Sequence, residues 1–244
     1  MTVNRSRRLI SISVLGGTLV ILTILAAGPL QHLDTHGHEY WSRMLPPEVQ
    51  YVLQHILDPI AGQAVCLPVL ATVAVVVAHR RRSWRPIICA MAAEAAFYVG
   101  VGGSKVLLAR PAPTEQDAEF FAGGILKDGW HGISYPSGHA AEAVLVYGTA
   151  VYLIARYTAA SRTTVRLLAV GVGLIALNAV AVSYTLGWHW ASDLFAGLLT
   201  GGLLLRLLVW WDTEAAARER EDQELAAERP LVPASYERTE KLAA

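Results

Sequence analysis

The sequence from Tyr135 to Tyr157, YPSGHAAEAVLVYGTAVYLIARY, decides the fold. From Gly138 onward it is predominantly apolar, and a helix of this length, rising about 1.5 Å per residue, can cross the hydrocarbon core of a bilayer. Its first two turns nevertheless contain His139 and Glu142. Ionisable residues in a membrane-spanning helix are candidates for function, so this helix is predicted to carry part of a site.

The composition of the whole chain agrees with a membrane protein. Of its 244 residues, 54% are hydrophobic and 16% are charged, whereas about a quarter are charged in a typical soluble domain. The formal net charge is zero, so no excess of positive charge indicates nucleic-acid binding. The apolar stretches that are long enough, or nearly so, to span a membrane are 9–30, 57–78, 86–108, 138–157, 167–186 and 193–211. The predicted fold class is therefore all-α, a polytopic membrane bundle of six transmembrane helices.

The basic residues predict the orientation of this bundle. Arginines precede the first span, follow the second and flank the fourth and fifth: Arg5, Arg7, Arg8, Arg80, Arg81, Arg82, Arg85, Arg156, Arg162 and Arg166. Because basic loops stay in the cytoplasm, both termini are predicted to be cytoplasmic, with the protein in the plasma (inner) membrane. The opposite side then holds Arg43, Lys105, Arg110 and Lys127.

Two groups of polar residues stand at the predicted outer ends of spans. Ser137 and Gly138 precede the fourth span, where free backbone N–H groups and the positive end of the helix dipole suit an anion such as phosphate. His189 and Asp193 begin the sixth span, four residues apart, so the carboxylate can hold one imidazole nitrogen and leave the other as a nucleophile. Taken alone, each group has a plainer interpretation as a helix cap.

A third group ends the third span. Lys105 can simply extend to the headgroups, but it lies eleven residues after Glu94, on the same helix face, which predicts that both point into the bundle. Arg110 follows in the outer loop. Glu142 shares a face with His139, and three roles stay open for it: tuning that histidine, binding a substrate headgroup, or pairing with another polar side chain.

Together these groups resemble the type 2 phosphatidic acid phosphatase family, membrane lipid-phosphate phosphatases related to vanadium haloperoxidases. The family has a lysine followed after six residues by Arg-Pro, then Pro-Ser-Gly-His, then Ser-Arg followed after five residues by a histidine and, four further on, an aspartate. Lys105, Pro136-Ser137-Gly138-His139 and His189 with Asp193 match in this order, and the resemblance covers roughly residues 55–211.

Two arginine positions of the family pattern are not matched. Counting from Lys105, the first falls on Ala112, and an Arg-Pro pair stands two residues early as Arg110-Pro111. The second falls on Ser183. The anion pocket is therefore predicted to be altered, with Arg110, Lys127 or His131 from the outer loop able to replace the missing charge.

The resemblance implies a phosphatase that acts on a lipid phosphate or polyprenyl diphosphate at the outer face. His189 would attack phosphorus, oriented by Asp193, and His139 would protonate the leaving oxygen. Residues expected to bind substrate are Lys105, Arg110, Ser137, Gly138 and Glu142. No metal or other cofactor is expected. The expected partners are a membrane lipid phosphate and the bilayer, with no nucleic acid, and the identity of the lipid and the oligomeric state stay open.

The spans, the charged C-terminal segment and the extent of the resemblance together predict a division of the chain into three segments. Residues 1–55 would hold the first transmembrane helix and an outer-face loop, residues 56–211 the phosphatase-like membrane core, and residues 212–244 a charged cytoplasmic tail.

Other functions remain open at this point. One is a phosphotransferase on the same scaffold that passes the phosphoryl group to a lipid or sugar hydroxyl. A second is a lipid-phosphate-binding protein of weak or no catalytic activity, or a carrier that uses Glu94 and Glu142 as proton sites. A third is metal binding by an outer-loop cluster, which consists of His32, Asp34, His36 and His38.

Overall fold

The computed structural model describes residues 2–37 and 44–228, with side chains from Leu9 onward. Within this part of the chain every regular element is helical, which confirms the all-α prediction. Residues up to Val209 form one compact unit, and the described residues from Trp210 belong to a second. The predicted segment boundaries after residues 55 and 211 stay predictions. His38 and Arg43 lie outside the described residues.

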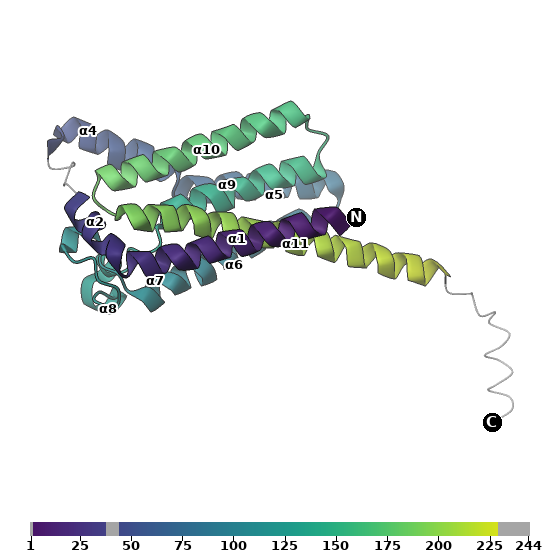
Figure 1. Ribbon diagram of the computed structural model, residues 1–244. Helices are drawn as coiled ribbons and strands as arrows, with labels where there is room; N and C mark the ends of the chain where they lie inside the picture. The colour runs from purple at the N-terminus through teal and green to yellow at the C-terminus, as the bar shows by residue number, and fades with distance from the viewer. Residues whose placement is uncertain (1, 38–43, 229–244) are drawn as a thin grey trace, which may run out of the picture. The chain divides into compact units, whose positions relative to one another are not determined.

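The long helices of the bundle are labelled in Figure 1. They are α1 (Thr2–Ala26), α5 (Gln63–Arg81), α6 (Arg85–Ala96), α9 (Gly138–Tyr157), α10 (Arg162–Thr185) and α11 (Ala191–Glu228). The short ones are α2 (Pro29–Gly37), α4 (Pro47–Val52), α7 (Gly103–Leu108) and α8 (Ile125–Asp128). Helical turns of other types occupy Leu53–Leu57, Asp58–Ile60, Phe97–Gly102, Pro113–Glu115 and Gly129–Gly132.

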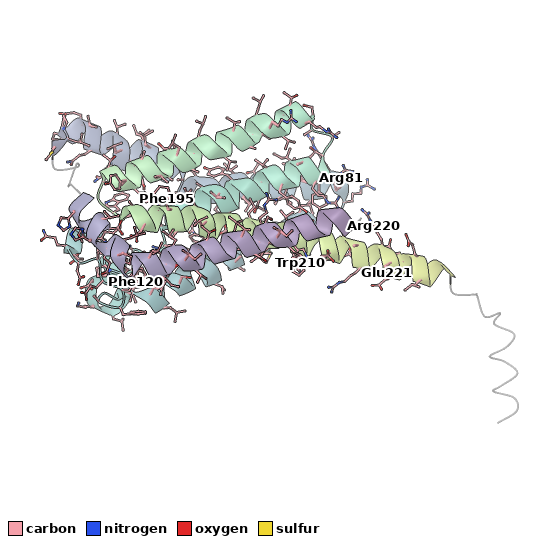
Figure 2. All side chains as sticks on the ribbon, in the orientation of Figure 1. Arg81, Phe120, Phe195, Trp210, Arg220 and Glu221 are labelled. Atoms are coloured by element: carbon pink, nitrogen blue, oxygen red, sulfur yellow. The ribbon has the colours of Figure 1, made fainter. Side chains whose placement is uncertain are left out.

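Six helical stretches of the described chain are long and apolar enough to cross a membrane. They are Leu9–Ala26, Pro47–Arg81, Arg85–Glu115, Gly138–Tyr157, Arg162–Thr185 and Ala191–Ala226. The six predicted spans are thereby confirmed, and the protein is a multi-pass membrane protein. Large apolar side chains are exposed on the helices, as expected for contact with lipid, among them Ile24, Leu167 and Phe195. Figure 2 labels Phe195.

Several helix boundaries differ from the predicted spans; α5, for example, begins at Gln63 instead of residue 57. The first span was predicted to reach residue 30, but α1 ends at Ala26 and Pro29 opens α2, because proline is accommodated in the first turn of a new helix. The fifth span begins five residues early at Arg162, because the Ser161 side chain accepts the backbone N–H of Thr164 (3.0 Å) and caps the helix. The last helix continues past residue 211 to Glu228.

Helix α9 is the centre of the bundle. In its span 56% of the residues are buried, against at most 33% in the other spans, so it is surrounded by protein while the others also face outward. It packs against α5, α6 and α10. The buried apolar core beside it includes Leu70 of α5, Cys89 of α6 and Leu145 of α9 itself.

Glycines of α11 allow its backbone to touch that of α9. A Cβ atom at Gly197 would lie 2.6 Å from the backbone oxygen of Ser137, and one at Gly201 would lie 2.5 Å from that of Ala141. Such small residues permit close helix crossing in membranes. The crossing brings the first turns of the two helices together, where the Ser137 N–H donates to the backbone oxygen of Asp193 (2.9 Å).

The substitution Gly197→Ala tests this crossing. The added methyl group would meet backbone atoms that cannot rotate away, so we expect a loss of about 1–3 kcal/mol in the free energy of unfolding, the usual cost of overpacking. Thermal unfolding in detergent measures it. Gly173→Ala in α10 is the matched control, because a Cβ there meets nothing within 4 Å. Equal effects of the two substitutions would contradict the close crossing.

Candidate active site

A cavity of about 500 Å³ lies at the end of the bundle where α7 ends and α9 and α11 begin. The three groups of residues singled out in the sequence meet there. Its lining includes Lys105, Ala112, His131, Gly138, His139, Glu142 and His189. Among the predicted site residues, Arg110, Ser137 and Asp193 are fully buried and do not line the cavity.

His189 is held in the turn before α11 and is 9% exposed. Its Nδ1 atom lies 3.6 Å from Oδ2 of Asp193, which is an electrostatic contact rather than a hydrogen bond. The same Oδ2 accepts the backbone N–H of Trp190 (3.0 Å), which fixes the turn that carries the histidine. Nε2 of His189 is therefore the nitrogen that faces away from the carboxylate.

Burial lowers the pKa of the His189 imidazole below its ordinary value, and the Asp193 carboxylate opposes part of this shift. The Lys105 ammonium adds to the lowering. A neutral imidazole is the form that can act as a nucleophile, so the environment keeps His189 reactive at neutral pH.

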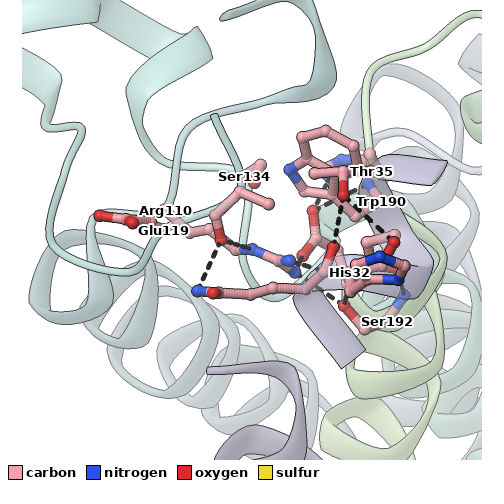
Figure 3. Close-up of polar contacts among 12 residues, drawn as sticks. His32, Thr35, Arg110, Glu119, Ser134, Trp190 and Ser192 are labelled. Carbon is pink, nitrogen blue, oxygen red and sulfur yellow. Dashed lines mark hydrogen bonds and ion pairs between the residues drawn. The ribbon is translucent and has the colours of Figure 1, made fainter. Parts of the chain in front are cut away.

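Arg110 lies behind this histidine rather than in the cavity. Its guanidinium is 0% exposed, donates from Nη1 to Asp193 Oδ1 (2.6 Å) and Ser192 Oγ (2.7 Å), and donates from Nη2 to Asp34 Oδ2 (2.8 Å). Its Nε donates to the backbone oxygen of Ala118 (2.9 Å). Figure 3 shows Arg110 among its polar contacts, with Ser192 labelled.

This position argues against the predicted substrate-binding role of Arg110. Its donors are already used by buried acceptors, and the ring of Phe120 covers one side of the guanidinium at 4.9 Å. Moving it into the cavity would leave Asp34 and Asp193 as uncompensated buried charges, which is strongly unfavourable. In the structure Arg110 positions Asp193.

Lys105 lines the cavity, and Ser137 caps the helix that begins beside it. The Lys105 ammonium donates to the backbone oxygens of Ile133 (2.9 Å) and Ser134 (3.0 Å), so it holds the loop before α9 as well as lining the cavity. The Ser137 hydroxyl accepts the N–H of Ala140 (3.4 Å) and caps α9. Gly138 faces Lys105, since a Cβ there would lie 3.8 Å from the lysine Cε atom.

The two unmatched arginine positions have different surroundings. Ala112 lines the cavity, so a longer side chain there would reach its interior. Ser183 is fully buried, and its hydroxyl has no hydrogen-bond partner among the described residues. Of the proposed replacements, His131 lines the cavity, whereas Lys127 is exposed and donates to the backbone oxygen of Ala122.

Asp58 is a site residue that the sequence interpretation missed. Its Oδ2 lies 3.2 Å from Nε2 of His139, and its own side chain is mostly buried. Asp58 is the only charged residue in the predicted span 57–78, so the rule that marks intramembrane ionisable residues as functional candidates would have found it. Asp34 was noted only as a possible metal ligand, and the structure pairs it with Arg110.

The family model of the PAP2 superfamily matches residues 84–216, which is more than half of the chain. The chain belongs to the PAP2 superfamily. This confirms the family resemblance seen in the motifs. Asp34 and Asp58 precede the matched region.

The PAP2 fold also appears in the comparison with solved structures. The crystal structure of a transmembrane PAP2-type phosphatidylglycerolphosphate phosphatase from Bacillus subtilis is similar, with a TM-score of 0.68 and 19% identity. The similarity covers 83% of this chain and 96% of that one. It shows that this chain has the fold of a PAP2 membrane phosphatase. No curated protein matches the sequence.

Metal binding by the outer-loop cluster gains no geometric support. Within residues 2–37 and 44–228, no three His, Cys, Asp or Glu side chains are grouped so as to hold an ion. His32 stacks on His36 with ring centroids 3.8 Å apart, and Asp34 is paired with Arg110.

The substitution Arg110→Met tests the positioning role. It leaves two carboxylates buried without their cation, so we expect the free energy of unfolding to fall by about 3–5 kcal/mol. Thermal unfolding in detergent measures this loss. The double variant Arg110→Met, Asp34→Asn removes one of the stranded charges and should recover part of it, as a double-mutant cycle would show. Additive losses would contradict the coupling.

Proposed function

We propose that the protein is an integral membrane phosphatase that hydrolyses a lipid phosphate or polyprenyl diphosphate through a phosphohistidine intermediate. The observation that carries the proposal is the buried His189, held beside Asp193 and opening into the cavity that Lys105, Gly138 and His139 also line. The superfamily membership supports the reaction class.

The mechanism follows from which ring nitrogen of His189 and of His139 lies beside a carboxylate. Nε2 of His189 attacks phosphorus in line, forming an N–P bond while the bond from phosphorus to the leaving oxygen breaks. Asp193 faces Nδ1 and stabilises the imidazolium that develops. Because Asp58 holds Nε2 of His139, Nδ1 of that ring donates the proton to the leaving oxygen. A water molecule then hydrolyses the phosphohistidine, with His139 as base.

The phosphoryl oxygens would be bound at the start of α9. The ammonium of Lys105 and the first N–H groups of that helix supply positive potential, and the helix dipole adds to it. Compared with a pocket that holds two arginines, this one lacks two charge-assisted contacts, each contributing on the order of 1.5–3 kcal/mol. Slow turnover or an unusual substrate is the expected consequence.

The proposed site faces the outer side of the plasma membrane. Arg81 lies at the opposite end of the bundle from the loop that holds Phe120 (Figure 2). The arginine-rich loops after α5 and α9 share that opposite end, where the Arg81 side chain donates to the backbone oxygen of Tyr157. Since such loops remain in the cytoplasm, the cavity is placed on the extracytoplasmic side by this proposal, and both termini on the cytoplasmic side.

Phosphate release from a panel of lipids in detergent tests the proposal. Phosphatidic acid, phosphatidylglycerol phosphate and a polyprenyl diphosphate are suitable, and we expect release from at least one. His189→Ala should abolish release, because the nucleophile is lost. Ala112→Arg should raise kcat/KM by about tenfold to a hundredfold, the effect of one restored charge-assisted contact.

The outcomes separate the competing functions. Release from none of these lipids would overturn the hydrolase proposal. A phosphorylated acceptor with little free phosphate would assign the chain as a transferase. Binding of lipid phosphates without release, unchanged in His189→Ala, would assign it as a binding protein.

The pH dependence of kcat/KM follows from the lowered pKa of His189. Only the neutral imidazole attacks, and burial extends the neutral form below the ordinary value of about 6.5. Activity should therefore fall on acidification with a midpoint below pH 6.5. Asp193→Asn removes the carboxylate that raises this pKa, so the residual activity should show the acid limb at still lower pH. An acid limb above pH 6.5 in the wild type would contradict the assignment.

A further inference from the structure

Glu142 is the one charged residue of the cavity lining that the proposed mechanism does not use. Its side chain is 5% exposed and still lines the cavity. The described part of the chain provides it with no hydrogen bond or ion pair closer than 4.0 Å. Burying an ionised carboxylate without a partner is unfavourable, so a cationic group that enters the cavity would be attracted to this position.

The cations near Glu142 are committed elsewhere. Lys105 donates to the backbone oxygens of Ile133 and Ser134, and His139, one turn before Glu142, is paired through Nε2 with Asp58. Arg110 is enclosed by Asp34 and Asp193. The two arginine positions of the family pattern hold Ala112 and Ser183. The cavity therefore combines a carboxylate with a reduced set of positive groups, which disfavours a substrate that brings only negative charge.

The position of Glu142 shows which part of a substrate would meet it. It follows His139 by three residues on α9, so the two side chains share a helix face and Glu142 lies about 4.5 Å further along the helix. His139 is the residue that protonates the leaving oxygen in the proposed mechanism. The group that meets Glu142 therefore belongs to the leaving alcohol, near its phosphate, rather than to the phosphoryl group.

We propose that Glu142 binds an ammonium group on the leaving alcohol, so that the preferred substrates are amino-alcohol phosphates. This inference rests on the proposed phosphatase function. An ammonium group supplies the cation that the carboxylate lacks and offsets the charge of the phosphate in a cavity without arginine. The same contact would give selectivity against alcohols that cannot donate, because the buried carboxylate would then stay unpaired.

Three matched substrates test the proposal: octadecyl phosphate, 2-hydroxyoctadecyl phosphate and 2-aminooctadecyl phosphate in mixed detergent micelles. In the wild type we expect kcat/KM for the amino compound to exceed that for the hydroxy compound by about 10- to 100-fold, the effect of one charge-assisted contact. In Glu142→Gln this ratio should fall close to one. Release from octadecyl phosphate should rise in the same variant, because the repulsion of the phosphate is removed.

Glu119→Gln is the matched control, since Glu119 is an exposed carboxylate of the outer loop and does not line the cavity. It should keep the wild-type ratio. Activity of Glu142→Gln on octadecyl phosphate shows that the variant is folded.

Several results would overturn the proposal. One is a wild type without preference for the amino compound, and another is a preference that persists in Glu142→Gln. Equal loss on all three substrates would make Glu142 a general requirement of the site. A preference for the hydroxy compound alone would mean that Glu142 binds a neutral hydrogen-bond donor and not an ammonium group. If the wild type releases phosphate from these substrates without preference, only this inference fails; if it releases none from them or from the lipid panel, the phosphatase function fails with it.

Discussion

The contact of α9 with α11 at Gly197 and Gly201 is the constraint on which the rest of the site depends. At these glycines the backbones approach so closely that a methyl group has no room. In a membrane, where lipid is as apolar as the side chains, such close packing is a main source of helix association. It joins the capped start of α9 to the start of α11, and so His139 and His189 line a single cavity.

A buried ion network then fixes the direction of the groups at the start of α11. Arg110 bridges Asp34 and Asp193, and the backbone N–H of Trp190 holds the second oxygen of Asp193. Removing any one charge of this network would leave a buried charge without its partner, which is strongly unfavourable. The network therefore serves to select one geometry for these side chains more than to increase the free energy of unfolding. The arginine that the family motif associates with substrate thus has a different place in this chain, and Asp34, from the N-terminal region, is its second partner.

The charged groups of this cavity differ from those expected in a cavity that binds phosphate alone. Its firmly placed cation is Lys105, and Ala112 lines it at a position where the family pattern has an arginine. Glu142 adds a carboxylate that no described side chain pairs. The N-terminal N–H groups of α9 remain available for an anion. The balance of charge therefore points to selectivity for the alcohol part of the substrate as well as for its phosphate.

The sequence by itself determined the six spans, the cap at Ser137, and the order of motifs that predicts His139, His189 and Asp193 to share one site. These features depend on local length, on helical spacing and on the order of short motifs, all of which can be read along the chain. Sequence reasoning did not foresee that Asp34 and Asp193 enclose Arg110, and it missed the contact of Asp58 with His139. Those residues meet partners that are distant in the chain. The pairing of buried charges is decided by how α2, the turn Asp58–Ile60, the loop that holds Arg110 and the first turns of α9 and α11 come together. Only the tertiary structure contains that information, because the free energy of a buried charge depends on every group that surrounds it in space and not on its neighbours in the chain.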